Sequence, residues 1–101
     1  MALYNSFVIK SFKDAETKRI YQRQRSRKLL SDIQQVALRK LRMINNAINI
    51  NDLRIPQANR LEKLMGNREG QYSIRINDQW RICFEWKSGD AFNVEITDYH
   101  S

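Results

Sequence analysis

The chain is poor in the residues that build disulfide-linked or metal-stabilised folds. Among its 101 residues there is one cysteine, Cys83, and one histidine, His100. A lone cysteine cannot form an internal disulfide, and these two residues cannot build a zinc site of His and Cys ligands from this chain alone. No acidic cluster has the spacing of a calcium loop. We therefore expect neither a metal nor a cofactor, and we interpret Cys83 as a buried thiol kept reduced in the cytoplasm.

Long apolar runs and targeting patterns are also absent. No segment approaches the roughly 20 apolar residues that a membrane helix needs. The start, Met1-Ala2-Leu3-Tyr4-Asn5, lacks the charged and then apolar pattern of a secretory signal. We expect a cytoplasmic protein with no membrane partner. The length suits one hydrophobic core and is too short for two ordinary domains, so residues 1–101 are predicted to form a single small domain.

Positive charge is abundant. The 18 Lys and Arg residues against 11 Asp and Glu give a formal net charge of +7, an excess that favours polyanionic partners such as RNA, DNA or an acidic membrane surface. An acidic partner protein would fit as well. Because many small soluble proteins are basic without binding nucleic acid, the composition leaves these partners open.

The N-terminal half shows one strand pattern and two helix patterns. The segment 7–12 is rich in β-branched and aromatic residues and predicts a short strand, and residues 14–27 predict a helix with a wide solvated face. Ser31 stands three residues before Gln34, the spacing of a capping box, and predicts the start of a second helix there. Apolar residues at steps of three and four predict its buried face: Ile33, Ala37, Leu41, Ile44 and Ile48.

The C-terminal third alternates apolar and polar residues with a period of two. After an irregular connector over 54–65, this period predicts strands around 72–76, 80–86 and 92–96, with Phe92 on the apolar side. Turn residues separate them, so the three strands should form an antiparallel meander. We predict an α+β fold: an N-terminal strand and two helices packed on one face of a mainly antiparallel sheet.

The polar side of this sheet gathers residues suited to a phosphodiester. The alternation of side chains along each strand places Arg75, Arg81 and Tyr99 on the face opposite the apolar residues, within reach of one another on an open surface. His100 follows at the strand end, where Asp98 could orient it through a ring nitrogen. The arrangement predicts a metal-free site.

Cleavage of RNA without a metal requires removal of the 2′-OH proton, stabilisation of an anionic phosphorane and protonation of the departing 5′-oxygen. Histidine, tyrosine and arginine supply these functions. Arg75 and Arg81 would lower the pKa of Tyr99 and neutralise the scissile phosphate. The residues alone leave a second interpretation open, in which Asp98-Tyr99-His100 is an ordinary polar chain end.

Two segments carry a family resemblance. The stretch 60–82, which ends in Ile74-Arg75-Ile76-Asn77-Asp78-Gln79-Trp80-Arg81-Ile82, closely resembles the HigB toxins of bacterial toxin–antitoxin systems, within the wider RelE-like superfamily. The ending Gly89-Asp90-Ala91-Phe92 followed by Asp98-Tyr99-His100 does so too. More loosely, 9–12 and 25–29 extend the resemblance over nearly the whole chain.

The resemblance implies a ribosome-dependent, metal-independent mRNA endonuclease that inhibits translation and arrests growth. Its partners would be the 70S ribosome, mRNA and a HigA-like helix-turn-helix antitoxin that neutralises it, with operator DNA contacted only through the toxin–antitoxin complex. A different class of function stays open: a catalytically inactive partner of the antitoxin that binds nucleic acid and acts mainly in operon autoregulation.

The resemblance also implies roles for particular residues. The family's C-terminal Asp-Tyr-His falls on Asp98, Tyr99 and His100, and the arginine of its Trp-Arg-Ile strand falls on Arg81. Expected RNA-binding residues are Arg75, Arg68, Lys63 and Ser73.

One position departs from the family pattern. Some relatives carry a second active-site histidine in the connector, where this chain has Glu62. Three alternatives follow: His100 works with Tyr99, it works with Glu62, or the activity is weaker than in those relatives.

Overall fold

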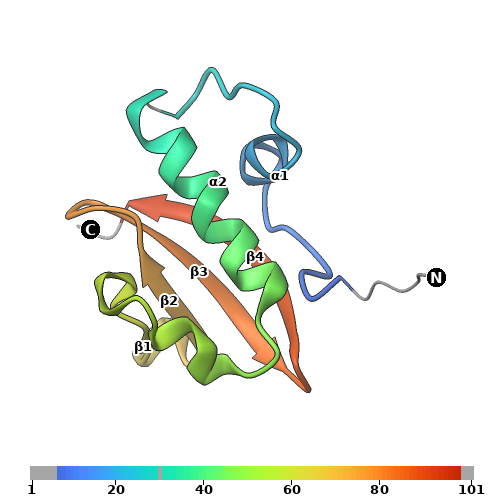
Figure 1. The fold of residues 1–101 in the computed structure, drawn as a ribbon, viewed down its shortest axis with the longest axis vertical. Helices are drawn as coiled ribbons and strands as arrows, with labels where there is room; N and C mark the ends of the chain where they lie inside the picture. The colour runs from blue at the N-terminus through green and yellow to red at the C-terminus, as the bar shows by residue number, and fades with distance from the viewer. Residues whose placement is uncertain (1–6, 30, 99–101) are drawn as a thin grey trace.

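The protein is built on an antiparallel sheet covered on one face by helices (Figure 1). The computed structural model describes residues 7–29 and 31–98. The elements in chain order are α1 (Ala15–Tyr21), α2 (Ser31–Asn46), the 3-10 helices η1 (Ile50–Arg54) and η2 (Gln57–Asn59), β1 (Glu62–Lys63), the 3-10 helix η3 (Gly66–Arg68), β2 (Gln71–Arg75), β3 (Trp80–Lys87) and β4 (Asp90–Asp98). The predicted α+β class is confirmed.

The sheet has the order β1-β2-β3-β4, with every neighbouring pair antiparallel. The predicted three-stranded meander is thus confirmed, and β1 adds a fourth strand at its edge. A bulge in β4 changes the alternation at one point: Asn93 has φ of 53°, and Phe92 pairs with Glu85 while Ala91 pairs with Trp86. The extra residue shifts the side-chain parity. The prediction for Phe92 is therefore wrong, and Ala91 is the core residue.

The N-terminal segment runs beside β4 but does not form a continuous strand. It makes two isolated parallel bridges, Ile9 with Ala91 and Phe12 with Val94. The backbone N–H of Ile9 donates to Asn45 Oδ1 at 3.0 Å, in α2, rather than to a strand. The expected strand is reduced to two bridges that lie on either side of the β4 bulge, where the backbone N–H of Asn93 donates to Ser11 Oγ at 2.8 Å instead of to a backbone carbonyl.

The first helix is shorter than predicted. Asp14 caps it, accepting from Thr17 N at 2.7 Å, but it ends at Tyr21, and Arg23 adopts a left-handed conformation with φ of 64°. A left-handed residue stops a helix. The predicted extension to residue 27 is therefore wrong.

The predicted capping box is also replaced by a different contact. Ser31 is the first residue of α2, and Gln34 bonds with the loop before it, accepting from Ser26 N at 3.1 Å and donating to the carbonyl of Leu29 at 2.9 Å. Buried Ser26 donates from Oγ to Glu16 at 2.6 Å. These bonds fix the course of the chain between α1 and α2.

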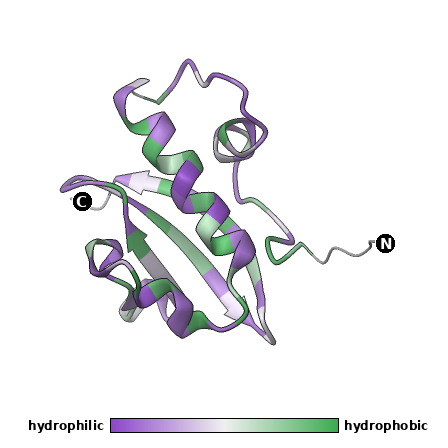
Figure 2. Ribbon diagram, viewed as in Figure 1, coloured by the Kyte–Doolittle hydropathy of each residue, from purple (hydrophilic) through white to green (hydrophobic). Residues whose placement is uncertain are grey.

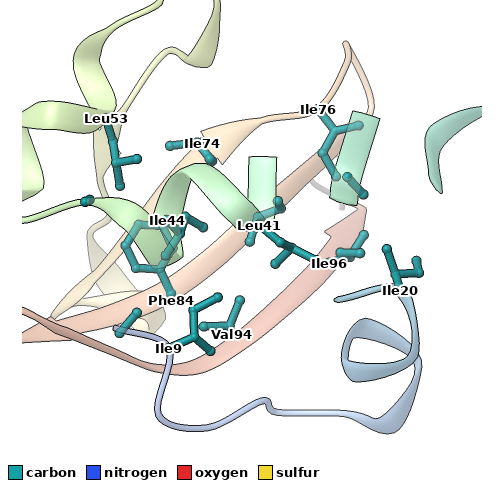
Figure 3. Close-up of a cluster of buried hydrophobic side chains, with 14 of the residues drawn as sticks. Ile9, Ile20, Leu41, Ile44, Leu53, Ile74, Ile76, Phe84, Val94 and Ile96 are labelled. Carbon is teal, nitrogen blue, oxygen red and sulfur yellow. The ribbon is translucent and has the colours of Figure 1, made fainter. Parts of the chain in front are cut away.

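The core lies between α2 and the sheet (Figure 3). Four residues of the predicted stripe are at most 2% exposed: Ile33, Ala37, Leu41 and Ile44. They pack in one cluster with Phe84 and Val94 of the strands. Figure 2 shows the hydrophobic bands of α2 and the strands that meet there. Ile48 is 88% exposed, contrary to prediction, because α2 ends at Asn46 and the helical spacing no longer applies.

Candidate active site

Arg81 lies on the polar side of the sheet but is buried, with only 7% of its surface exposed. Its Nε donates to Ser73 Oγ at 2.8 Å, and its Nη2 donates to the backbone carbonyl of Arg60 at 2.6 Å. A carboxylate oxygen of Glu62 lies 3.6 Å from Nη2. The expectation of an arginine on an open surface is therefore wrong for Arg81. Its guanidinium is held in a fixed orientation.

Three elements place these partners. Ser73 in β2 pairs with Cys83, two residues beyond Arg81 on β3, so its hydroxyl lies diagonally across from the guanidinium. Glu62 in β1 pairs with Ser73 and so faces the same side. Register alone thus brings Glu62, Ser73 and Arg81 together.

Arg75 and Arg81 are direct cross-strand partners, as the parity argument predicted. Their guanidinium groups nevertheless go to different partners. Arg75 pairs with Asp78 in the turn after β2, and 30% of its side chain is exposed. Like charges opposite one another repel, and each arginine here has its own carboxylate.

Arg68 belongs to a separate ionic cluster further along the same face. Its Nη1 donates to Glu95 Oε2 at 2.9 Å and to Gln71 Oε1 at 3.0 Å, and Lys13 reaches the same Glu95 oxygen at 3.4 Å. Beside this cluster, burial raises the pKa of the Cys83 thiol, although Arg68 acts in the opposite direction. Cys83 is fully buried, as predicted.

The end of β4 leads toward Arg81. Thr97 pairs with Arg81, and Asp98 pairs with Trp80 and accepts from Gln79 Nε2 at 2.9 Å. Tyr99 and His100 lie outside the described residues. Their predicted places, and the predicted contact of Asp98 with His100, stay predictions.

Two of the expected RNA-binding residues do not share the exposed surface of the others. Ser73 is fully buried, and its hydroxyl accepts from Arg81. Lys63 is exposed but pairs with Tyr72, so it projects from the opposite side of β1 to Glu62. The structure groups Ser73 with Arg81 as its support and separates Lys63 from both.

Sequence reasoning missed Arg60, which takes part through its backbone carbonyl. It has a left-handed conformation, with φ of 45° and ψ of 58°, and a carbonyl carries no residue-type signal. It also missed Glu95, although the alternation of β4 places Glu95 opposite Val94 and Ile96 and so on the polar face. The alternation of apolar and polar residues in β4 could therefore have identified Glu95 as a candidate.

Over residues 7–29 and 31–98, no three His, Cys, Asp or Glu side chains are grouped as metal ligands would be. In the same residues, no helix combines the length and apolar character needed to cross a membrane.

A second basic region lies between the two helices. We define the α1–α2 arginine loop as Arg23, Arg25, Arg27 and Lys28 together with Arg19 in the last turn of α1, all exposed. It forms much of the hydrophilic chain at the top of Figure 2. In the described part of the chain, only Arg19 of this set forms an ion pair, with Glu16 at 3.5 Å. Arg23 and Arg25 also line a surface cavity of about 400 Å³ whose apolar lining includes Ile20 and Leu38.

Comparisons with known proteins agree with one another. Residues 10–100 match the model of a family described as the RelE-like toxin of the type II toxin–antitoxin system HigB. The chain is 41% identical to Toxin HigB-1 of Vibrio cholerae over 86 residues, 84% of this chain and 90% of that protein. It is 39% identical to Endoribonuclease HigB of Proteus vulgaris over 61 residues, 60% of this chain and 65% of that protein. It is also 42% identical to an uncharacterised protein of Haemophilus influenzae over 74 residues, 73% of this chain and 72% of that protein. The chain therefore belongs to the HigB family of RelE-like toxins of type II toxin–antitoxin systems.

Proposed function

We propose that the protein is an endoribonuclease that cuts mRNA on the 70S ribosome without a metal ion of its own. Membership of the toxin family and the name of the Proteus vulgaris relative support RNA cleavage. The observation that carries the proposal is the buried cation of Arg81, held by Ser73 and the Arg60 carbonyl beside the end of β4. A preoriented charge in a site shielded from water stabilises developing negative charge more strongly than one in solvent.

In this proposal, His100 and its partner, Tyr99 or Glu62, divide the two proton transfers. One group takes the proton from the 2′-OH as the 2′-oxygen attacks the phosphorus, and the other gives a proton to the 5′-oxygen as its bond to phosphorus breaks. A Glu62 carboxylate can fill only the first role, with His100 as the proton donor. The products are a 2′,3′-cyclic phosphate and a 5′-hydroxyl. Arg81 stabilises the phosphorane between the two steps, and Asp98 orients His100.

Glu62 is a candidate for the second proton-transfer group. Half of its side chain is exposed, and it lies 3.6 Å from Arg81, so it can reach a substrate phosphate placed beside that arginine. Replacing Glu62 with Gln and timing transcript cleavage on ribosomes tests this role. A large loss identifies Glu62 as the partner, and an unchanged rate assigns the role to Tyr99.

The partners in this proposal follow the family. A HigA-like helix-turn-helix antitoxin binds and neutralises the protein in the bacterial cytoplasm, and operator DNA is contacted through that complex. Arg68 and Arg75 contact RNA. Both side chains are about one-third exposed on the polar side of the sheet.

The deciding experiment programs purified ribosomes with a defined mRNA and adds the wild-type protein, His100→Ala or Tyr99→Ala. The wild type should cut the transcript, and each variant should lose most of the activity while still binding the antitoxin. Lys18→Ala, an exposed change on α1, is the matched control and should cut at the wild-type rate. An intact transcript with the wild-type protein would instead favour a non-catalytic partner of the antitoxin.

A further inference from the structure

Lys40 is a buried lysine within the apolar stripe of α2. It lies between Ala37 and Ile44 on the face that packs inward, and 5% of it is exposed. Its Nζ donates to Oδ1 of Asn59, and it forms no ion pair with a described carboxylate. A lysine is rarely buried to this extent without a carboxylate partner, because desolvation disfavours the charge. Its presence in the stripe is therefore not explained by packing.

Asn59, the acceptor, is fully buried and uses both ends of its amide. Nδ2 donates to the carbonyl of Leu53 at 3.2 Å and contacts Met43 Sδ at 3.7 Å, while Oδ1 accepts from Lys40. The side chain thus ties the end of η2 to α2 and to η1. The position of residue 59 is therefore fixed by contacts with both α2 and η1.

The next residue connects this contact to the candidate site. Arg60 adopts the left-handed conformation, which a residue with a side chain keeps only where its surroundings enforce it. Its carbonyl accepts from Arg81 Nη2, and Glu62 contacts the same nitrogen two residues later. A shift at Asn59 would move the Arg60 carbonyl and Glu62, the two groups that contact Nη2 of Arg81.

We propose that Lys40 and Asn59 are positioning residues that fix the Arg60 carbonyl and so set the orientation of Arg81 for RNA cleavage. Neither residue touches the substrate. The proposal rests on the proposed function in one respect, that Arg81 contributes to cleavage, whereas its structural part concerns the guanidinium alone.

The structural part is tested by nuclear magnetic resonance of the Arg81 Nε–H group, which is buried and bonded to Ser73. Protein with ¹⁵N-labelled arginine gives this signal, and Arg81→Lys identifies it by its loss. Lys40→Met and Asn59→Ala should each speed hydrogen exchange of this group by about tenfold or more, as expected when a fixed partner is lost. Ile33→Val, a core change in the first turn of α2, controls for general destabilisation. Exchange that is unchanged, or raised equally by the control, overturns the proposal.

The functional part is tested by single-turnover cleavage on ribosomes, at a temperature where circular dichroism shows all variants folded. Lys40→Met should lower the maximal rate by about tenfold, since small misplacements of a catalytic group have large effects. The protein concentration for half-maximal rate should change less than twofold. In an Arg81→Ala background, Lys40→Met should have no further effect, because residues that act through one group are not additive.

An equal loss in both backgrounds would show that Lys40 acts independently of Arg81 and overturn the proposal. If Arg81→Ala alone leaves the rate unchanged, the proposed role of Arg81 fails instead. The exchange measurement then still decides whether Lys40 and Asn59 position its guanidinium.

Discussion

The two basic regions of this toxin use arginine in opposite ways. Arg81 is buried, with Ser73, the Arg60 carbonyl and Glu62 around its guanidinium. The α1–α2 arginine loop is exposed, and one of its five cations has a described ion pair. A buried, oriented cation acts at short range and depends on its supports, whereas exposed cations act on any polyanion over about a Debye length, roughly 8 Å at physiological salt. The net charge of +7 does not distinguish the buried cation from the exposed ones.

The largest effect is expected at the buried region. Arg81→Ala should lower the cleavage rate on ribosomes by about 100-fold, the scale for removal of one preoriented donor. It should also destabilise the fold, because Ser73 Oγ and the Arg60 carbonyl lose their donor. Arg81→Lys keeps the positive charge but lacks the forked guanidinium, so its cleavage rate should lie between those of Arg81→Ala and the wild type. Wild-type cleavage by Arg81→Ala would remove the functional distinction between the two regions.

The next largest effect is expected from the hydrogen bonds that fix the α1–α2 arginine loop. Ser26→Ala removes the hydroxyl that donates to Glu16 and accepts from the backbone of Lys28 and Leu29. Loss of a buried hydrogen-bonding group costs about 1–3 kcal/mol, so urea denaturation should show a drop of that size. Gln35→Ala, an exposed change on α2, is the control and should change little. A loop that keeps its stability without Ser26 would not be fixed by these bonds.

A smaller effect is expected from the charges of the loop. Changing Arg23, Arg25 and Arg27 together to Gln should shift the free energy of unfolding by less than about 0.5 kcal/mol per site, as for other exposed substitutions. It should weaken association with RNA at low salt and flatten the salt dependence. Stopped-flow binding to a labelled RNA over a salt series measures both. Equal salt slopes for the variant and wild type would contradict long-range action by the loop.

The smallest effect is a dependence of stability on pH. Burial lowers the pKa of Lys40, and the charges of Arg39 and Arg75 act in the same direction. Between this lowered pKa and the usual lysine value, the unfolded chain binds more protons than the folded one, so stability rises with pH. Denaturation from neutral to alkaline pH should show this rise in the wild type and not in Lys40→Met. Parallel curves for the two proteins would contradict a lowered pKa in the fold.

Regular patterns in the sequence predicted most of the fold. The period of two predicted β2, β3 and β4, and the stripe from Ile33 to Ile44 predicted the buried face of α2. The incorrect predictions concern places where a local backbone conformation interrupts the regular spacing of apolar residues. The bulge at Asn93 moved Phe92 to the polar side, and the left-handed Arg23 lies just beyond the end of α1. β1 has two exposed residues, too few for any period to be detected.

The candidate site was predictable only in part. Strand parity placed Arg75 and Arg81 opposite one another, which the register confirms. It could not predict that Arg81 is buried, because its acceptor at Arg60 is a backbone carbonyl delivered by a connector without a pattern. Contacts between a side chain and distant backbone depend on the path of the whole chain.

If this chain cuts RNA through its own side chains, with Arg81 as the fixed cation, the new RNA ends carry the products of attack by the 2′-oxygen. The most direct test is to cut a translated mRNA on purified ribosomes and to determine the chemistry of the new ends. We expect a 5′-hydroxyl and a 2′,3′-cyclic phosphate or its opened 3′-phosphate, with a yield that falls about 100-fold in Arg81→Ala. New ends bearing a 5′-phosphate and a 3′-hydroxyl would contradict this expectation.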